Sequence, residues 1–371
     1  MSRLRSVLKP AVWIFYLVIV FEILFMISPL ALYFYSAYGP ALNVLHRWPA
    51  MAWLTRFFLP HFSQTRSPLL NALPMAAGLL IIAGMMLFFA AAIPLYWAKL
   101  RRRGAVTGGL YALIRHPQYL GLALLGLGTT LIWPRFLVLI AYVTMLFLYA
   151  SLARWEEERS LAQFGESYRA YQTRTGMFLP QPLSKKIPRI LPTSGGRRVA
   201  AVLGLYLLLI AATVVLGLAL RDYALAKISA FYTEDVAVLS PALLTDQELH
   251  AAYRTAMADV RVQEALRGAD PAKQLVYVVP VEWDLPDLPM ERVHRSGGHY
   301  VPADFDRWHY KLLFTRVRTH AAAPTGQDIV KTAYGRDPIA LVKVDSAAGE
   351  VTGIDSPPPH VAWGDIPTPM F

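Results

Sequence analysis

The chain has 371 residues, of which 55% are hydrophobic and only 16% are charged, and its mean hydropathy is +0.38. These values are more typical of an integral membrane protein than of a soluble domain. Because the sequence contains no cysteine, it excludes disulfides, thiolate metal sites and cysteine nucleophiles.

Charge is distributed unevenly along the chain. Residues 1–220 carry 21 Lys and Arg against 5 Asp and Glu, whereas residues 221–371 carry 15 against 20. The basic residues gather mainly at the ends of hydrophobic segments, where they act as topological anchors, so the net charge of +11 does not indicate nucleic-acid binding. The contrast predicts a membrane half and a second domain in different surroundings.

The first hydrophobic segment runs from Ala11 to about Tyr38, after three basic residues. It is longer than the core of a signal peptide and long enough to cross a bilayer, so we expect a retained span. Glu22 lies inside it and is expected to serve helix packing or proton sharing, or to belong to a site.

The second predicted span covers Leu69–Ala98 and ends at a basic cluster, residues 99–103, which indicates a cytoplasmic end. Between the two spans, residues 39–68 contain four prolines. They predict an interfacial connection with one short amphipathic helix at about Ala50–Phe58.

The third and fourth hydrophobic segments, Tyr119–Trp133 and Phe136–Ala153, predict a tight helical hairpin. Its first arm carries Gly121, Gly126 and Gly128, which would permit close approach of another helix or of a ligand. The chain then becomes amphipathic from Ser151 to Tyr171, with one helical face formed by residues 157, 161, 164, 168 and 171.

A fifth span, Val199–Leu220, would deliver residues 223–371 to the outer side of the membrane. We expect that domain to be α+β. A capping box at Thr245 opens a helix to about Arg267, Gln274–Val281 and Tyr310–Arg318 look like strands, and Ile339–Val344 pairs with Val351–Ile354. Four histidines of this domain have a spacing that fits no tight metal site: His294, His299, His309 and His320.

Two polar segments flank the hairpin, which would return them to the same membrane interface. Their side chains suit S-adenosylmethionine, because its carboxylate needs cationic donors, its ammonium needs a carboxylate, and its sulfonium is attracted to aromatic rings. The residues that supply this set are Tyr111, Arg115, His116, Tyr119, Glu157, Glu158, Phe164, Tyr168 and Tyr171. A polar girdle at a membrane interface would contain the same residue types, and from chemistry alone this alternative stays open.

The residue pattern of the two segments is more specific than their chemistry. Gly109-x-Tyr111-x-x-x-Arg115-His116-Pro117-x-Tyr119-x-Gly121, followed by Glu157-Glu158-x-x-Leu161-x-x-Phe164-Gly165-x-x-Tyr168-x-x-Tyr171, resembles the signature of the isoprenylcysteine carboxyl methyltransferase and phospholipid methyltransferase family. The resemblance covers residues 104–180, including the hairpin between the motifs. One departure is Arg174-Thr175-Gly176-Met177, which lacks the valine usual after the last tyrosine.

The resemblance implies methyl transfer from S-adenosylmethionine, bound in a pocket that opens to the cytoplasm, to an amphiphile that arrives from the lipid. It implies that Arg115, His116, Pro117 and Tyr119 form the lip of the cofactor pocket, with Gly109 and Gly121 beside it. Glu157 and Glu158 would be the carboxylates of the closing helix, and Tyr168 and Tyr171 its aromatic lid. Arg115 would orient a carboxylate acceptor, and Glu157 or Glu158 would accept the proton of an amine acceptor.

The sequence thus predicts an α-helical multi-pass protein of the inner membrane with about five hydrophobic segments, followed by an α+β domain. The predicted domains are a methyltransferase-like domain (1–190), a linker with an additional span (191–222) and an extracytoplasmic domain (223–371). The predicted partners are the bilayer and a membrane lipid or lipidated substrate. The alternative is a non-enzymatic sensor or assembly factor whose outer domain binds a protein partner.

Overall fold

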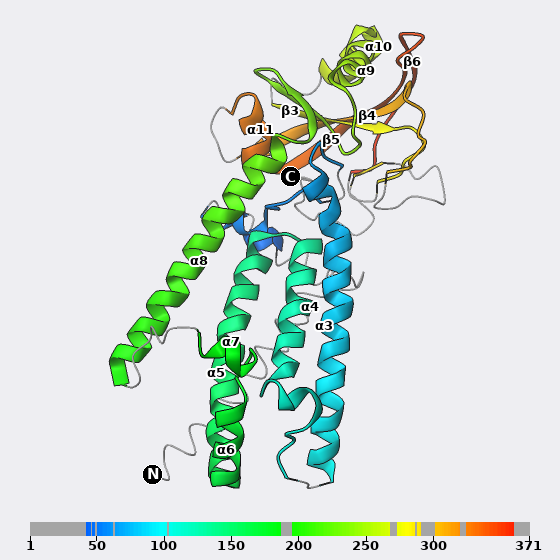
Figure 1. Ribbon diagram of the computed structural model, residues 1–371. Coiled ribbons are helices and arrows are strands. Elements are labelled where there is room, and N and C mark those ends of the chain that lie inside the picture. The colour runs from blue at the N-terminus through cyan, green and yellow to red at the C-terminus, as the bar shows by residue number, and fades with distance from the viewer. Residues whose placement is uncertain are drawn as a thin grey trace. The chain divides into compact units, whose positions relative to one another are not determined.

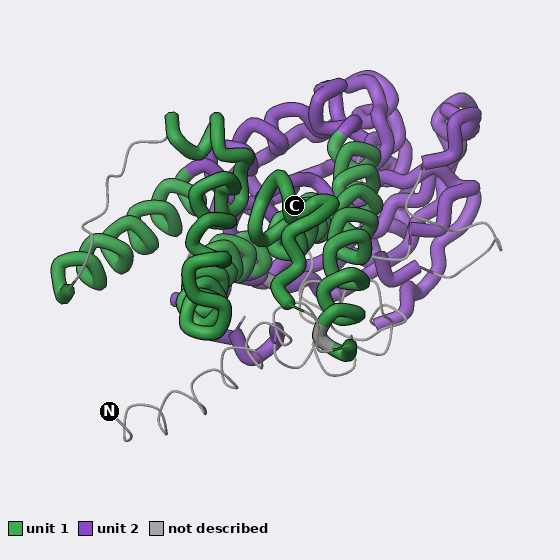
Figure 2. Tube along the Cα trace, turned by 60° about the horizontal axis from the view of Figure 1, so that its bottom comes forward, with its two compact units in different colours: residues 1–27, 73–133, 138–215 green, residues 28–72, 134–137, 216–371 purple. Residues whose placement is uncertain are grey.

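The structure is a computed structural model, and it describes residues 42–45, 47–48, 50–61, 64–101, 104–186, 195–267, 273–285, 288–290, 301–319 and 324–359. The predicted first span with Glu22 lies outside these residues, and so do His294, His299 and His320. The chain forms two compact units (Figure 2). Unit 1 comprises residues 1–27, 73–133 and 138–215, and unit 2 comprises residues 28–72, 134–137 and 216–371.

Long helices make up much of the chain between Pro68 and Leu225 (Figure 1). In the described part, three helices are long and apolar enough to cross a membrane: α3 (Pro68–Leu100), α5 (Phe136–Phe164) and α8 (Gly195–Leu225). The apolar helix α4 (Pro117–Ile132) has only 16 residues. The length and composition of α3, α5 and α8 support a helical membrane protein, but the expected count of about five spans is not confirmed.

Helices α3 and α4 pack closely within unit 1, and glycine makes this possible. A Cβ atom added to Gly121 would lie 2.6 Å from the backbone nitrogen of Phe88, and one added to Gly128 would lie 2.7 Å from the carbonyl oxygen of Ala77. Neither contact leaves room for a side chain, so these glycines serve close approach of the two backbones.

The amphipathic stretch predicted from Ser151 to Tyr171 is interrupted, so the expectation of one helical face running through it was wrong. Helix α5 continues to Phe164, and a second helix, α6 (Glu166–Arg174), starts after Gly165. Gly165 has a φ angle of 57°, which favours glycine and turns the chain out of the α5 axis. The turn allows α6 to return beside the loop that precedes α4, which contains the 3-10 helix η3 (Gly109–Ala112).

At the position of the predicted amphipathic helix, the connection before α3 holds a 3-10 helix, η2 (Ala52–Thr55). Its following residues form an antiparallel bridge to the α4–α5 connection, between Phe57 and Arg135. Backbone bonds from Phe58 N to Pro134 O (2.8 Å) and from Phe136 N to Arg56 O (3.1 Å) hold the two segments together. Such pairing between two distant segments of the chain satisfies backbone groups that a short helix would leave unbonded.

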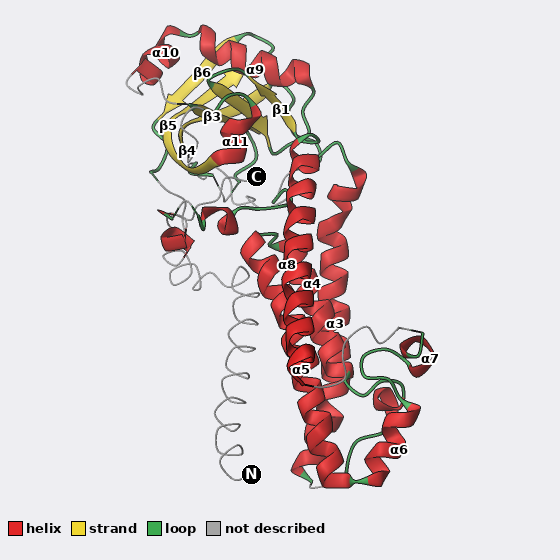
Figure 3. Ribbon diagram, turned by 90° about the vertical axis from the view of Figure 1, so that its left-hand side faces the viewer, coloured by secondary structure: helices red, strands yellow, loops and turns green. Residues whose placement is uncertain are grey.

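The C-terminal part of unit 2 is α+β, as predicted. A single sheet contains six strands in sequential order: β1 (Ser229–Tyr232), β2 (Val236–Ser240), β3 (Gln274–Pro280), β4 (His309–Thr319), β5 (Ala333–Asp345) and β6 (Glu350–Asp355). Neighbouring strands are antiparallel, except that β2 and β3 are parallel and are joined through α9 (Asp246–Ala258) and α10 (Val260–Arg267) (Figure 3).

Local signals located most of these elements. Thr245 accepts from the backbone of Glu248 in a complete capping box, and strands β3 and β4 and the β5–β6 hairpin lie where they were predicted. The helix expected to run to Arg267 is instead two helices, because Asp259 adopts an extended conformation. Strands β1 and β2 and the short helix α11 (Gln327–Thr332) were not predicted.

Helix α9 packs against all six strands and α11 against β2 to β5. Six consecutive residues of β3, from Leu275 to Pro280, are buried, which means that both faces of this strand are covered.

Candidate active site

The loop before α4 is fastened to the segment that follows α6. The amide of Arg115 donates to the carbonyl oxygen of Gly176 (2.9 Å) and the amide of His116 to that of Met177 (3.1 Å). Pro117 then starts α4 at a position where its missing amide proton is not needed. The two motifs, which are far apart in sequence, therefore meet through their backbones.

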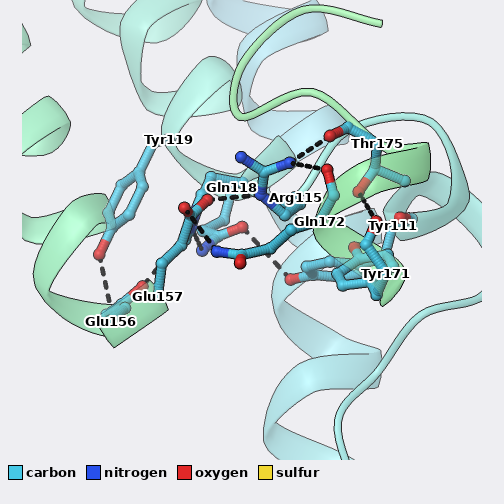
Figure 4. Close-up of polar contacts among 10 residues, drawn as sticks. Tyr111, Arg115, Gln118, Tyr119, Glu156, Glu157, Tyr171, Gln172 and Thr175 are labelled. Carbon is cyan, nitrogen blue, oxygen red and sulfur yellow. Dashed lines mark hydrogen bonds and ion pairs between the residues drawn. The ribbon is translucent and has the colours of Figure 1, made fainter. Parts of the chain in front are cut away.

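The carboxylate of Glu157 is the centre of this cluster (Figure 4). Arg115 Nε donates to Glu157 Oε1 (2.5 Å), and Gln172 Nε2 donates to Glu157 Oε2 (3.1 Å). His116 Nε2 lies 3.3 Å from Glu157 Oε1. The Arg115 and Glu157 side chains keep only 11% and 10% of their surface exposed, so this is a buried ion pair.

Arg115 also fixes the end of α6. Its Nη1 donates to the carbonyl oxygens of Gln172 (3.2 Å) and Thr175. A guanidinium offers its donors in a fixed planar arrangement, so engaging Nε and Nη1 determines its orientation. Arg115 thus links the carboxylate on α5 to the backbone after α6.

A second carboxylate, Glu156, lies on the other side of the His116 ring. His116 Nδ1 is 3.6 Å from Glu156 Oε2, and the hydroxyl of Tyr119 donates to Glu156 Oε1 (3.0 Å). The imidazole packs against Tyr119, with ring centroids 5.6 Å apart. His116 Nε2 is buried and makes no hydrogen bond in the described part of the chain.

Three buried phenols close the cluster from the side of α6 and η3. The Tyr171 hydroxyl donates to the carbonyl oxygen of Tyr111 (2.6 Å), and the Tyr111 hydroxyl donates to that of Ala91 (3.2 Å). Burial raises the pKa of Tyr111 and Tyr168, and raises that of Tyr171 to about 12. These phenols therefore stay protonated at neutral pH and act as donors.

The structure brings together most of the residues that the sequence singled out: Tyr111, Arg115, His116, Pro117, Tyr119, Glu157, Tyr168 and Tyr171 are within this cluster or directly beside it. Phe164 is half-buried at the end of α5, and Gly109, with φ 62°, begins η3. Gly121 contacts the backbone of α3. Their proposed part in cofactor binding stays a prediction.

Glu158 differs from its neighbours because its side chain is exposed. Within the described residues it forms no ion pair with Arg154, although an i, i+4 spacing on α5 places the two side chains on the same helix face. Sequence reasoning did not select four residues that contact the central groups: Gln118, Glu156, Gln172 and Thr175. Glu156 could have been found, because it belongs to the same run of three glutamates, but the pattern did not show which two of the three turn inward.

Comparison with known proteins agrees with the motifs. The family model for phospholipid methyltransferases matches residues 75–167, which include α4, Arg115 and Glu157. The segment belongs to the isoprenylcysteine carboxyl methyltransferase and phospholipid methyltransferase family. This confirms the resemblance inferred from the sequence. Protein-S-isoprenylcysteine O-methyltransferase of Schizosaccharomyces pombe is 33% identical to the chain over 76 residues.

That alignment covers 20% of this chain and 32% of the yeast protein, so the chain spans about a third of the length of this relative. No solved structure matches the chain. The family match ends before Tyr168 and Gln172, and it does not reach the α+β domain. The methyltransferase-family segment therefore accounts for α3 to α5 and the polar residues on them.

Proposed function

We propose that this chain is an integral membrane methyltransferase that uses S-adenosylmethionine and methylates an amphiphile held in the membrane, either an isoprenylcysteine-type carboxylate or a lipid head-group amine. The observation that carries the proposal is the meeting of Arg115, His116 and Glu157 in one buried cluster within the family-matched segment. A polar girdle would require only that these residue types lie at the same depth. It would not require their contact.

The chemistry of the cluster fits the proposed cofactor. S-adenosylmethionine, when bound, supplies a methyl group carried on a positively charged sulfur. Glu156 and Glu157 offer carboxylates for cationic groups, and the buried His116 Nε2 is a polar atom that still lacks a hydrogen bond among the described residues. The rings of Tyr119 and Tyr149, stacked with centroids 5.1 Å apart, offer an aromatic surface of the kind that attracts cations.

The contacts refine the roles proposed for the catalytic residues. Arg115 engages Nε and Nη1 within the protein, so we assign it mainly to holding Glu157 in place, and its Nη2 is the group that could orient an acceptor carboxylate. For an amine acceptor, Glu157 or Glu158 would accept the proton. Glu157 is held rigidly, whereas Glu158 is exposed and could act only at the rim of the site.

Burial of Tyr168 and Tyr171 on α6 supports the proposal that this helix excludes water from the cluster. Excluding water strengthens every electrostatic contact inside a site and protects a reactive group from hydrolysis. We further propose that Gly109, Pro117 and Gly121 shape the loop and the start of α4 beside the cofactor, and that Phe164 contributes an apolar wall.

The topology follows from charge. The basic residues at the end of α3 support a cytoplasmic position for the N-terminus and the cofactor site, and an extracytoplasmic position for the α+β domain, residues 223–371. A reporter that is active only outside the cytoplasm, fused after Phe371, should be active. Activity of a cytoplasmic reporter at the same position would remove one crossing from this topology.

Binding of S-adenosylmethionine to the purified protein, measured by calorimetry, tests the site. We expect His116→Ala and Glu157→Gln to weaken binding at least about tenfold, which is the effect of losing one charge-assisted contact. Glu166→Gln is the matched control, because Glu166 is exposed on α6 and forms an ion pair with the exposed Arg169. Wild-type affinity in both site variants would refute the proposed site.

Membranes incubated with cofactor labelled in its methyl group then identify the acceptor class. Label in the lipid fraction favours a head-group acceptor, and alkali-labile label in the protein fraction favours a carboxyl ester. Membranes that hold the His116→Ala protein should take up only background label. Equal uptake with wild type and this variant would mean that another enzyme is responsible.

A further inference from the structure

A group of arginines gathers in unit 2, around the short segment that follows η2. Arg221, on the last turns of α8, donates from Nη1 to the carbonyl oxygen of Phe57 (2.7 Å) and from Nη2 to that of Val330 (3.4 Å). Arg56 Nη1 donates to the carbonyl oxygen of Lys331 (2.9 Å). Arg135 donates to the carbonyl oxygen of Thr55, and its guanidinium lies 4.5 Å from the Phe57 ring centroid.

These cations are buried. Arg135 is 0% exposed and Arg221 is 6% exposed, and Arg56 is partly buried. Arg56 and Arg221 donate to the carbonyl oxygens of adjacent residues, Lys331 and Val330, so the two cations lie near each other and repel. Asp222, the next residue after Arg221, is the neighbouring carboxylate. Asp222, however, is already in an ion pair with Lys331, at 2.8 Å.

Among the described residues, the ion pairs include neither Arg56 nor Arg221. Their hydrogen bonds to Lys331, Phe57 and Val330 go to neutral carbonyl oxygens, which satisfy donors without cancelling charge. Arg56 Nε is buried and makes no hydrogen bond within the described part of the chain. Buried charges in proteins are normally paired, so the cluster retains an excess of positive charge and at least one free donor.

The position of these residues in the chain indicates which anion lies near them. Arg135 directly precedes α5, and Arg221 lies four residues before the end of α8. Both helices are long and apolar enough to span a membrane, so both arginines come at span ends, where lipid phosphates lie. Guanidinium groups also match the geometry of phosphate oxygens, to which they can donate in pairs.

We propose that Arg56, Arg135 and Arg221 form a binding site for a phosphate group, carried by a phospholipid or free in solution. Bound phosphate would cancel the repulsion between Arg56 and Arg221 and accept from the free donor of Arg56. This site is separate from the cluster around Glu157 and does not depend on methyl transfer. It would couple the segment after η2 to the phosphate layer of the membrane.

Native mass spectrometry of the full-length, delipidated protein tests the proposal, with phosphatidylglycerol as one probe and a galactosyl diacylglycerol, which has no phosphate, as its control. We expect the wild type to retain the phospholipid preferentially, and Arg56→Gln and Arg221→Gln to lower its affinity about tenfold, as expected for loss of one charged hydrogen bond. Arg254→Gln, which removes an exposed cation of α9, should bind as the wild type does.

A second measurement distinguishes the source of the phosphate. The melting temperature of the delipidated protein is compared in sodium phosphate and in sodium chloride at equal ionic strength. Stabilisation by phosphatidylglycerol alone assigns the site to lipid, and stabilisation by inorganic phosphate as well assigns it to phosphate in general.

The two variants differ in how much they disturb the fold. Arg221→Gln could unfold the protein, because Arg221 is buried. Arg56→Gln removes the hydrogen bond to the carbonyl oxygen of Lys331 from a partly buried side chain, and its folding is checked by size-exclusion chromatography. The proposal is overturned if the wild type neither prefers the phosphate-bearing lipid nor responds to inorganic phosphate, or if folded Arg56→Gln binds both as tightly as the wild type. The arginines would then only brace the backbone.

Discussion

Replacing Glu157 by glutamine tests the structure most directly, because this change removes charge and leaves the shape of the side chain nearly unchanged. The wild-type carboxylate accepts from Arg115 at 2.5 Å and from Gln172 at 3.1 Å, and the ion pair is about nine-tenths buried. Removing one partner of a buried pair costs roughly 3–5 kcal/mol. The glutamine oxygen can still accept from Arg115, so we expect the lower end, about 3 kcal/mol.

The assay is thermal unfolding of the purified protein in detergent. At roughly 2–4 °C per kcal/mol, Glu157→Gln should lower the melting temperature by roughly 6–12 °C. Glu158→Gln makes the same chemical change one residue later, on an exposed side chain, and should leave the melting temperature unchanged. If the two variants lose the same stability, or if Glu157→Gln loses none, the buried pair between Arg115 and Glu157 does not exist as described.

Three further changes probe other contacts. Gly121→Ala would place a Cβ atom 2.6 Å from the backbone nitrogen of Phe88, and thermal unfolding should show a stability loss of about 1–3 kcal/mol. Gly78→Ala on α3 is the control, because its added Cβ atom would have no neighbour within 4 Å and should cost no stability. Equal losses of stability in the two variants would contradict the close packing of α3 and α4. Gly165→Ala forces a side chain into a backbone conformation with φ 57°, so it should lower the stability of the protein by about 1–3 kcal/mol and weaken cofactor binding. If the variant keeps both its stability and its affinity for the cofactor, the chain does not turn between α5 and α6 at this residue. In unit 2, the hydrogen bond from His309 to Asp306 (2.8 Å) and the nearby Asp345 raise the pKa of His309. The charged imidazole therefore stabilises the fold below the unfolded-state pKa of about 6.5, and this stabilisation is lost as the pH rises through the higher folded-state pKa. The melting temperature of wild type should therefore exceed that of His309→Asn at about pH 5.5 and converge with it at about pH 9; a difference that stays constant or grows with pH would contradict the pairing.

The sequence alone determined the features that depend on runs of neighbouring residues. Long apolar stretches specified α3, α5 and α8, because a helix that satisfies its own backbone is the structure such a stretch can adopt in lipid. The capping box at Thr245 located the start of α9, and the two polar motifs located the family-matched segment. Each signal is the sum of local preferences, and so it can be recognised without knowing what the segment packs against.

The sequence predicted helix boundaries less accurately than the presence of the helices. Periodicity from Ser151 to Tyr171 is compatible with one straight helix, but Gly165 ends α5 and lets α6 turn back. The short strands β1 and β2 were not predicted, for a related reason. Their four and five residues are too few for a clear pattern, and pairing within the sheet defines them.

Only the tertiary structure decided which polar side chains meet. Three consecutive glutamates look alike in sequence, and the packing of α5 against the loop before α4 turns Glu157 toward Arg115 and leaves Glu158 exposed. Likewise, Arg56, Arg135 and Arg221 are far apart in the sequence, and they meet through the bridge between Phe57 and Arg135 and through hydrogen bonds to distant carbonyl oxygens. The physical reason is the same in both cases: the energy of a charge depends on its partners and its burial, and these are set by residues far away in the chain.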